Sequence, residues 1–237
     1  MNKYWTFNND YFNLVKSIKS NSIDLILTDP PYNINQYSTG NILISGRKPI
    51  NNDICYWDKK EIYPSDLAFE FSRIIKPTGN IFVFTGYNKF GDWHKSFNHL
   101  FKTFQFVVWH KLNPTPKIYK NGFLNSCELI ACMWNKNHTW NFTSQAKMHN
   151  FIECKVCSYP ERLKHPFHPT QKPVEILKTL IKISSNVNDI VFDPFMGVGS
   201  TGVAALELNR KFLGIEINKS YYIAANERLI HSAKVTI

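Results

Sequence analysis

The sequence predicts an α/β fold built on a mostly parallel β-sheet. Short apolar runs alternate along the chain with amphipathic stretches, which is the pattern of strands followed by helices. The apolar runs are continuous, as expected for strands that are covered on both faces. With 237 residues, of which 43% are hydrophobic, the chain can form one domain with a substantial core. We therefore predict a single domain over residues 1–237.

The first predicted strand, Ile23–Thr28, reads IDLILT and stops at a turn that contains two prolines. Later runs such as IFVFT, IVFD and FLGIEI have the same character. The full set of predicted strands is Ile23–Thr28, Ile81–Thr85, Phe104–His110, Glu128–Trp134, Ile190–Asp193 and Phe212–Ile217. The amphipathic stretches between them predict helices at Pro64–Ile75, Lys89–Phe101, Pro173–Ser184, Ser200–Leu208 and Ser220–Ser232.

Two segments interrupt this alternation. Residues 35–60 are polar and contain Gly40, Gly46 and Pro49, and residues 136–164 mix polar, basic and aromatic side chains without a clear period. Long irregular segments within a compact domain are often functional. We interpret the first as a substrate loop and the second as a short target-recognition region. We expect both to connect strands at the ligand-binding edge of the sheet.

A glycine-containing loop follows the strand that ends at Asp193. The segment DPFMGVGST places Gly197 and Gly199 before a helix, where the backbone can approach a ligand closely. The start of that helix offers free N–H groups to an anionic group. Glu216 ends the next strand, a position where a carboxylate can accept from ribose hydroxyls. This pattern predicts a site for an adenosine-containing cofactor.

A second turn, Thr28-Asp-Pro-Pro-Tyr-Asn33, follows the strand Ile23–Thr28. Two consecutive prolines stiffen the turn and remove backbone donors, so carbonyl oxygens and the Asp29 carboxylate remain as acceptors. An exocyclic amine on a base presents two N–H groups to such acceptors, and Tyr32 can stack on a base rotated out of a duplex. The turn therefore predicts chemistry on an amino group of a nucleobase.

The charge of the chain favours a polyanionic partner. The formal net charge is +10 and the pI is about 9.3, and a basic surface attracts nucleic acid. Basic residues gather in the two irregular segments and beside them, and these are candidate phosphate contacts. The candidates for DNA binding are Arg47, Lys48, Lys111, Arg162 and Lys164.

No apolar run approaches the ~20 residues of a membrane span, and the polar start, MNKYWTFNND, does not resemble a signal peptide. The five cysteines are odd in number, so we expect free thiols in a cytoplasmic protein. Cys154 and Cys157 form a CxxC pair with His165 and His168 downstream, a spacing that a zinc site could use. His168 belongs to another motif, and we predict no metal.

These motifs together resemble the beta group of amino DNA methyltransferases, in which the catalytic turn precedes the cofactor loop in a circularly permuted order. The resemblance extends over nearly the whole chain and includes the segment HPTQKP at 168–173. It implies a three-layer Rossmann-like methyltransferase fold with a seven-stranded sheet. The implied catalytic residues are Asp29, Pro30, Pro31 and Tyr32. The implied cofactor-binding residues are Asp10, Tyr11, Asp29, Thr170, Lys172, Asp193, Phe195, Gly197, Gly199, Ser200, Thr201 and Glu216. Ser200 departs from the threonine usual in the family but keeps a hydroxyl.

The resemblance implies transfer of a methyl group from S-adenosylmethionine to N6 of adenine in double-stranded DNA, because Asp-Pro-Pro-Tyr accompanies that reaction in the family more often than cytosine N4 methylation. Cytosine N4 methylation, an RNA adenine methyltransferase and a non-catalytic, cofactor-dependent nucleic-acid-binding protein stay open as alternatives, as does single-stranded DNA as substrate. A restriction-modification system with a cognate endonuclease, or an orphan modification enzyme, is the implied setting. The short recognition segment also suggests a homodimer.

Overall fold

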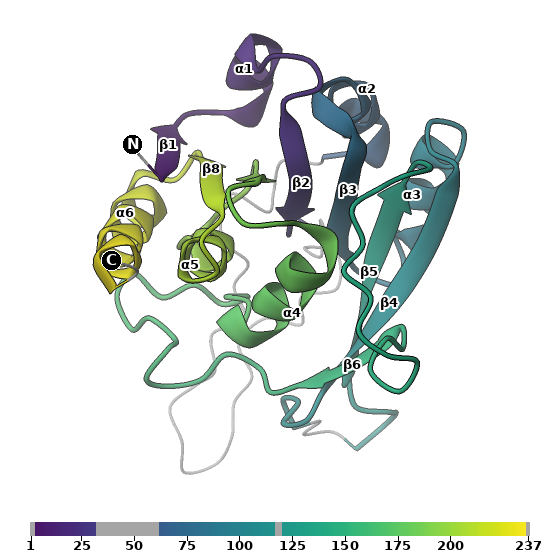
Figure 1. Ribbon diagram of the computed structural model, residues 1–237. Helices are drawn as coiled ribbons and strands as arrows, with labels where there is room; N and C mark the ends of the chain where they lie inside the picture. The colour runs from purple at the N-terminus through teal and green to yellow at the C-terminus, as the bar shows by residue number, and fades with distance from the viewer. Residues whose placement is uncertain (1–2, 32–61, 117–119, 236–237) are drawn as a thin grey trace.

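The computed structural model describes residues 3–31, 62–116 and 120–235. These residues form a sheet with the strand order β1-β8-β7-β2-β3-β5-β4-β6 (Figure 1). The strands are β1 (Tyr4–Asn8), β2 (Ile23–Thr28), β3 (Ile75–Thr85), β4 (Thr103–Lys111), β5 (Cys127–Trp134), β6 (Phe151–Cys154), β7 (Ile190–Asp193) and β8 (Lys211–Glu216).

The sheet is mostly parallel, as predicted. β5 is the strand that runs against its neighbours, since it pairs antiparallel with both β3 and β4, and the other pairings are parallel. The expected number of seven strands is wrong: the sheet described here has eight. The eighth arises because β6 adds to the outer edge of β4 within a segment that the sequence analysis treated as irregular.

Helices cover both faces of the sheet and make the three predicted layers (Figure 1). One core cluster joins the sheet to α1, α2 and α3 through side chains such as Tyr11, Phe71 and Trp93. The other joins it to α4, α5 and α6 through Leu177, Val203 and Leu229. The helices are α1 (Tyr11–Leu14), α2 (Pro64–Ile74), α3 (Phe90–Phe97), α4 (Val174–Ser184), α5 (Ser200–Glu207) and α6 (Lys219–Val235), with a 3-10 turn η1 (Val15–Ser17) after α1.

The strand β1 was not expected from the sequence. It lies at one edge of the sheet and leaves Trp5 and Phe7 partly exposed, at 39% and 46%. An edge strand with mixed exposure lacks the continuous apolar run that marks the buried strands. The strand β1 nevertheless matters for the site, because Asn9 N donates to the Glu216 carbonyl (3.1 Å) and so places Asp10 beside the end of β8.

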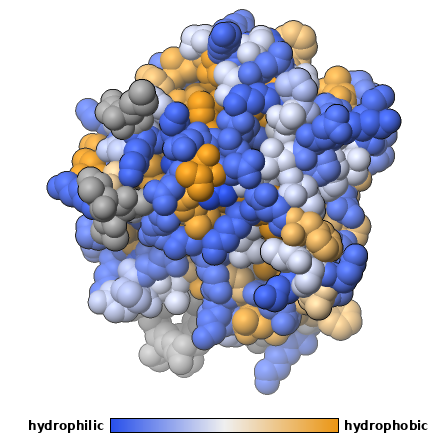
Figure 2. Space-filling model, viewed as in Figure 1, coloured by the Kyte–Doolittle hydropathy of each residue, from blue (hydrophilic) through white to orange (hydrophobic). Residues whose placement is uncertain are grey.

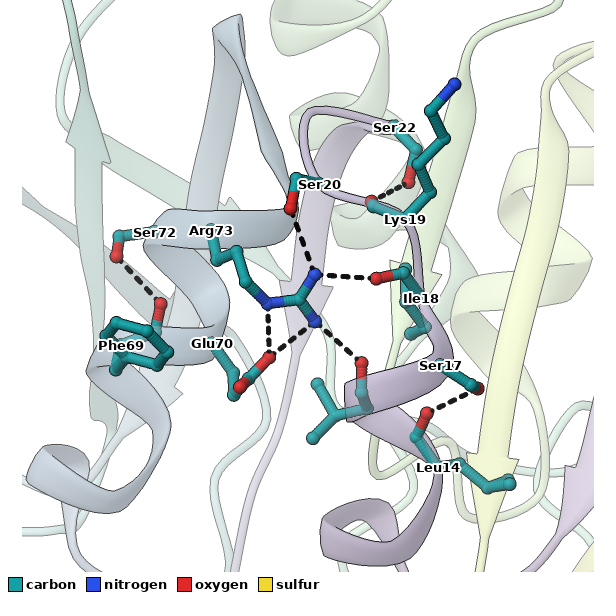
Figure 3. A network of polar contacts seen from close by, with 11 residues as sticks. Leu14, Ser17, Ile18, Lys19, Ser20, Ser22, Phe69, Glu70, Ser72 and Arg73 are labelled. Carbon is teal, nitrogen blue, oxygen red and sulfur yellow. Dashed lines mark hydrogen bonds and ion pairs between the residues drawn. The ribbon is translucent and has the colours of Figure 1, made fainter.

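Arg73 on α2 fixes the segment that leads from α1 to β2 (Figure 3). Its guanidinium donates to the carbonyl oxygens of Val15 and Ile18, at 2.9 and 2.7 Å, and to the carboxylate of Glu70. Because charge-assisted hydrogen bonds are stronger than neutral ones, Arg73 holds the N-terminal segment against the helix layer. This contact fixes the connection between η1 and the start of β2.

The carboxyl ends of β2, β3, β7 and β8 lie at one edge of the sheet, and α5 starts there. The connection between β4 and β5 emerges at the same edge, since His110 pairs with Cys127 and Thr85 with Leu129. In open α/β sheets ligands bind at this edge.

Among the described helices, none has the length and apolar character that a membrane span requires. The face seen in Figure 2 is largely hydrophilic, with small, separated hydrophobic patches.

The target-recognition segment follows a different path from the one we expected. It begins at the opposite edge, because β5 ends at Trp134, which pairs with Asn80 and Thr103. Asn141 then donates its backbone N–H to the Ile183 carbonyl at the end of α4 (2.7 Å). The chain returns through β6, parallel to the end of β4, and reaches the ligand edge only after Cys154. The predicted substrate loop, 35–60, lies outside the described residues.

Candidate active site

The catalytic turn begins at the carboxyl end of β2, between β7 and β3. Asp29, Pro30 and Pro31 follow the buried Thr28, whereas Tyr32 lies outside the described residues. Thr28 Oγ1 donates to Asp193 Oδ1 at 2.7 Å, and the two residues are 165 positions apart in the sequence. This hydrogen bond joins the catalytic turn to the start of the glycine loop.

Asp193 is buried, with 3% of its surface exposed. Burial raises the pKa of its carboxyl group to about 6, against the hydrogen bonds from Thr28, Thr201 and the backbone N–H of Phe195. The Phe195 N–H lies 3.1 Å from Asp193 Oδ1. The Asp193 carboxylate therefore fixes the start of the glycine loop, because it accepts hydrogen bonds from Thr28, from the Phe195 N–H and from Thr201.

The glycine loop adopts a backbone that favours glycine. Gly197 and Gly199 have φ values of +51° and +78°, in the left-handed region. A Cβ at Gly197 would lie 2.9 Å from His168 Nε2, and one at Gly199 would lie 3.0 Å from the Ala225 Cβ. Gly199 caps α5, whose first residues Ser200 and Thr201 are buried. The loop thus leaves bare backbone at the ligand edge.

Glu216 lies across from this loop at the end of β8. Its Oε2 accepts from Gly197 N at 2.9 Å and its Oε1 from Asn218 N at 2.7 Å. Burial raises the pKa of Glu216 to about 7, although these backbone donors favour the ionised form. A carboxylate oxygen has more than one lone pair, so both oxygens still have capacity for hydroxyl donors.

Asp10 and Tyr11 approach the same place from the N-terminal segment. Asp10 caps α1, with Oδ1 accepting from Phe12 N at 3.0 Å. Tyr11 is buried and its ring lies 5.6 Å from that of Phe195. Burial, followed by the Glu70 carboxylate, raises the pKa of Tyr11 far above its usual value, so Tyr11 is a neutral packing residue beneath the loop.

Lys172 contacts the catalytic turn directly, a position that the sequence did not indicate. Its Nζ lies 2.5 Å from Asp29 Oδ2 and 3.1 Å from Glu128 Oε1, and its side chain is 8% exposed. Burial disfavours the ammonium, but the carboxylates of Asp29 and Glu128 outweigh it and raise the pKa of Lys172. Thr170, two residues earlier, is exposed.

A hollow opens beside the turn on the side of α2 and α3. Its lining is mainly apolar and includes both prolines of the turn and the buried ring of Trp93. Flat, apolar walls next to outward-facing acceptors suit an aromatic ring that carries a polar edge. The lining residues are Pro30, Pro31, Ile62, Pro64, Thr85, Lys89 and Trp93.

The predicted phosphate contacts divide into two kinds. Lys164 is exposed at the ligand edge, with its Nζ 4.9 Å from the ring centroid of Tyr159. Arg162 instead donates to the Pro169 carbonyl and lies over the Phe167 ring, so its guanidinium binds the neighbouring loop. Lys111 pairs with Glu128 at 3.1 Å. Arg47 and Lys48 lie outside the described residues.

The CxxC pair does not gather metal ligands. Cys154 and Cys157 are buried thiols whose pKa burial raises to about 12, and Cys154 Sγ lies 3.5 Å from Glu175 Oε2. The described residues contain no group of three or more His, Cys, Asp or Glu side chains that could hold a metal ion.

Comparison with known proteins shows the family to which this chain is related. A family profile, N6_N4_Mtase, described as DNA methylase, matches residues 23–227, which span both the catalytic turn and the glycine loop. The chain belongs to this family. The predicted class of DNA methyltransferase is thereby confirmed, and so is the order in which the two motifs follow one another.

The chain is 33% identical to the Type II methyltransferase M2.LlaDCHI of Lactococcus lactis subsp. cremoris, over 93% of this chain and 87% of the relative. It is 31% identical to the Type II methyltransferase M2.DpnII of Streptococcus pneumoniae, over 96% and 90%. The crystal structure of an M1.HpyAVI–SAM complex covers 95% of this chain and 100% of its own, with a TM-score of 0.71 and 27% identity. These similarities confirm the methyltransferase fold and support S-adenosylmethionine as the cofactor.

Two residues of the site were missed from the sequence. Thr28 was predicted to end a strand and start the turn but was given no role of its own, although its side chain bonds Asp193 at the end of the neighbouring strand. Glu128 was assigned only to a strand, because the sequence does not reveal that β5 is antiparallel and starts at the ligand edge. If β3 had been known to pair with an antiparallel strand, the start of that strand, and with it Glu128, would have been predicted at the ligand edge.

Proposed function

We propose that this protein transfers a methyl group from S-adenosylmethionine to N6 of an adenine at specific sites in double-stranded DNA. The observation that carries the proposal is the hydrogen bond between Thr28 and Asp193, which brings the catalytic turn against the glycine loop. A methyl donor on the loop and an amine on the turn would then meet at one edge of the sheet.

The described residues fit the cofactor. Glu216 has lone pairs for ribose hydroxyls, and Asp10 lies next to the end of β8. A buried carboxylate acceptor at the end of a strand suits the ribose hydroxyls of an adenosine moiety. When bound, S-adenosylmethionine supplies an electrophilic methyl group on a sulfonium.

The catalytic turn acts on the amine. The Asp29 carboxylate and the Pro30 carbonyl accept its two N–H groups, which directs the nitrogen lone pair toward the methyl donor. In this proposal the base, once it has left the duplex, lies against the apolar surface that Pro30 and Pro31 form. Since the amine proton becomes acidic as the N–C bond forms, the turn needs acceptors more than a strong general base. Positioning and water exclusion supply most of the rate.

The surface of the ligand edge suits DNA. Lys155 and Lys164 are exposed, and so are the rings of Tyr159 and Phe167 in the same loop. Cations position a phosphate backbone, and aromatic rings contact bases. Sequence choice would then reside in the part of 136–164 that follows Cys154, helped by 35–60. The proposed setting is the cytoplasm of a bacterium, with a bacterial or phage-encoded gene, beside a cognate restriction endonuclease and with a second subunit on the same duplex.

The deciding experiment expresses the chain in a host without DNA methylation and identifies the methylated base by mass spectrometry of hydrolysed DNA. N6-methyladenine at one recurring sequence is the expected product. N4-methylcytosine, or methylation of RNA alone, would contradict the proposal.

Replacing Asp29 with Ala should reduce methyl transfer by at least about 10³-fold, because it removes an acceptor for the amine. The affinity for S-adenosylmethionine should stay within a few-fold, measured by calorimetry. Gly91→Ala is a matched control on α3, where a Cβ would meet nothing within 4 Å. Full activity of the Asp29 variant would rule out this mechanism.

A further inference from the structure

Four charged side chains alternate in sign along the ligand edge. They come from the catalytic turn, the loop before α4, β5 and β4, in the order Asp29, Lys172, Glu128 and Lys111. The distances between successive charged atoms are 2.5, 3.1 and 3.1 Å. The side chains are 21%, 8%, 12% and 20% exposed, so the row is largely removed from water.

The position of Lys172 raises a difficulty for catalysis. Its ammonium holds Asp29 Oδ2, which is an oxygen of the carboxylate that the target amine needs. A buried ammonium with a single counterion would resist any movement of that counterion, because the charge would be left uncompensated. Glu128 offers the second carboxylate, and its other oxygen is held by Lys111.

We propose that Glu128 is a positioning residue that keeps the Lys172 ammonium neutralised, so that Asp29 can turn its carboxylate to the target amine. This inference rests on the proposed function, since it assigns Glu128 to the step in which Asp29 accepts the amine. Glu128 touches neither base nor cofactor in this role; it acts through Lys172.

The surroundings of Lys172 agree with this role. The Phe84 ring centroid lies 5.1 Å from its Nζ, on the β3 side. The titratable neighbour from its own loop is His168, whose pKa is lowered to about 3 by burial and by the charges of Lys172, Arg162 and Arg228. His168 is therefore neutral in working conditions, and the negative charges facing Lys172 are those of Asp29 and Glu128.

The test compares Glu128→Gln with the control Glu207→Gln, which removes a glutamate paired with Lys178 on α5 and α4. We expect kcat for Glu128→Gln to fall at least about tenfold, while the KM and the binding constant for S-adenosylmethionine change less than about threefold. Glu128→Asp should recover at least threefold of the lost kcat, and Glu207→Gln should match the wild type. An unchanged kcat, a parallel loss of cofactor binding, or no recovery with Asp would each overturn the proposal.

A second readout does not depend on activity. In the apoprotein, NMR titration of labelled lysine should show Lys172 titrating at a lower pH in Glu128→Gln than in the wild type, since one neighbouring carboxylate is lost. If Glu128→Gln folds poorly because Lys111 loses its partner, Lys111→Met with Glu128→Gln restores the charge balance. That double variant should keep both the low kcat and the lower Lys172 titration; wild-type values for either would refute the role.

Two measurements distinguish a failure of this inference from a failure of the proposed function. The product base formed by the wild type tests the proposed function. The ratio of variant to wild-type kcat, on whichever amino base the wild type methylates, tests the role of Glu128.

Discussion

Single residues in this site combine burial with charge, and the carboxylates differ in what their surroundings provide. Asp193 is surrounded by protein donors and joins two motifs, whereas Glu216 faces the ligand edge with lone pairs to spare. Burial raises the pKa of both, to about 6 and about 7. The same physical cause thus acts on a carboxylate that protein donors surround and on one that is predicted to bind the cofactor.

The pKa of Glu216 makes cofactor binding dependent on pH. In the proposed binding mode ribose hydroxyls would donate to the ionised carboxylate, so we expect binding to favour the deprotonated form. With a pKa of about 7, roughly one carboxylate in ten is ionised at pH 6. The dissociation constant of S-adenosylmethionine should therefore fall about tenfold as the pH rises from 6 to 8, and then level off.

Calorimetry at several pH values measures this trend, with Glu216→Gln as the control. The amide cannot ionise, so the variant should bind more weakly and lose the tenfold dependence. A wild-type curve that is flat from pH 6 to 8, or that runs in the opposite direction, would mean that Glu216 binds as the neutral acid.

At the scale of elements, the sequence predicted the strands that are buried and missed the ones at the edges. The runs at 23–28 and 190–193 were found with their observed bounds, because burial on both faces requires continuous apolar residues. The helix expected at 89–101 spans only Phe90–Phe97. The edge strands β1 and β6 carry exposed side chains, and no local pattern distinguishes them from loops.

The candidate site was predicted where a motif lies within one segment. The turn at Asp29 and the loop at Gly197 could be recognised, since each follows its own strand. The pairing of Lys172 with Asp29 and Glu128 could not be, because it depends on three segments that meet only after β5 inserts between β3 and β4. Strand order is a property of the folded sheet, and the spacing of the motifs along the sequence does not reveal it.

The loop from β6 to α4 gives a prediction at this scale, because its two predicted DNA contacts differ in structure. Arg162 binds the Pro169 carbonyl, and Gln171 of the same motif accepts from Leu163 N and donates to the Glu161 carbonyl. Arg162→Ala should therefore loosen the loop and lower the melting temperature by several degrees. Lys164→Ala should weaken DNA binding with little effect on the melting temperature.

Scanning calorimetry and a DNA-binding titration on both variants test this division. If Arg162→Ala leaves the melting temperature unchanged and alters only the methylated sequence, Arg162 reads DNA and its contact with Pro169 is dispensable. If Lys164→Ala binds and methylates DNA as the wild type does, the exposed cation has no part in the interface.

The whole molecule carries a net charge of +10 and belongs to a family of DNA methylases, so its charge has an evident partner. Lysines that neutralise phosphates release condensed counterions, and the affinity for DNA then falls with added salt. If about four or five phosphates are contacted, log K plotted against log salt concentration should have a slope of roughly −4.

The affinity for S-adenosylmethionine should change little over the same salt range, since the residues predicted to hold the cofactor, such as Asp193, Ser200 and Glu216, are buried. Lys155→Ala and Lys164→Ala should each reduce the slope by about 1, because each lysine accounts for one phosphate. Lys16→Ala is the matched control, because Lys16 is also exposed but lies in η1, outside the β6–α4 loop. A nearly flat plot for the wild type would show that the positive charge does not contribute to DNA binding. Equal slopes in all variants would show that the β6–α4 loop is not part of the DNA interface.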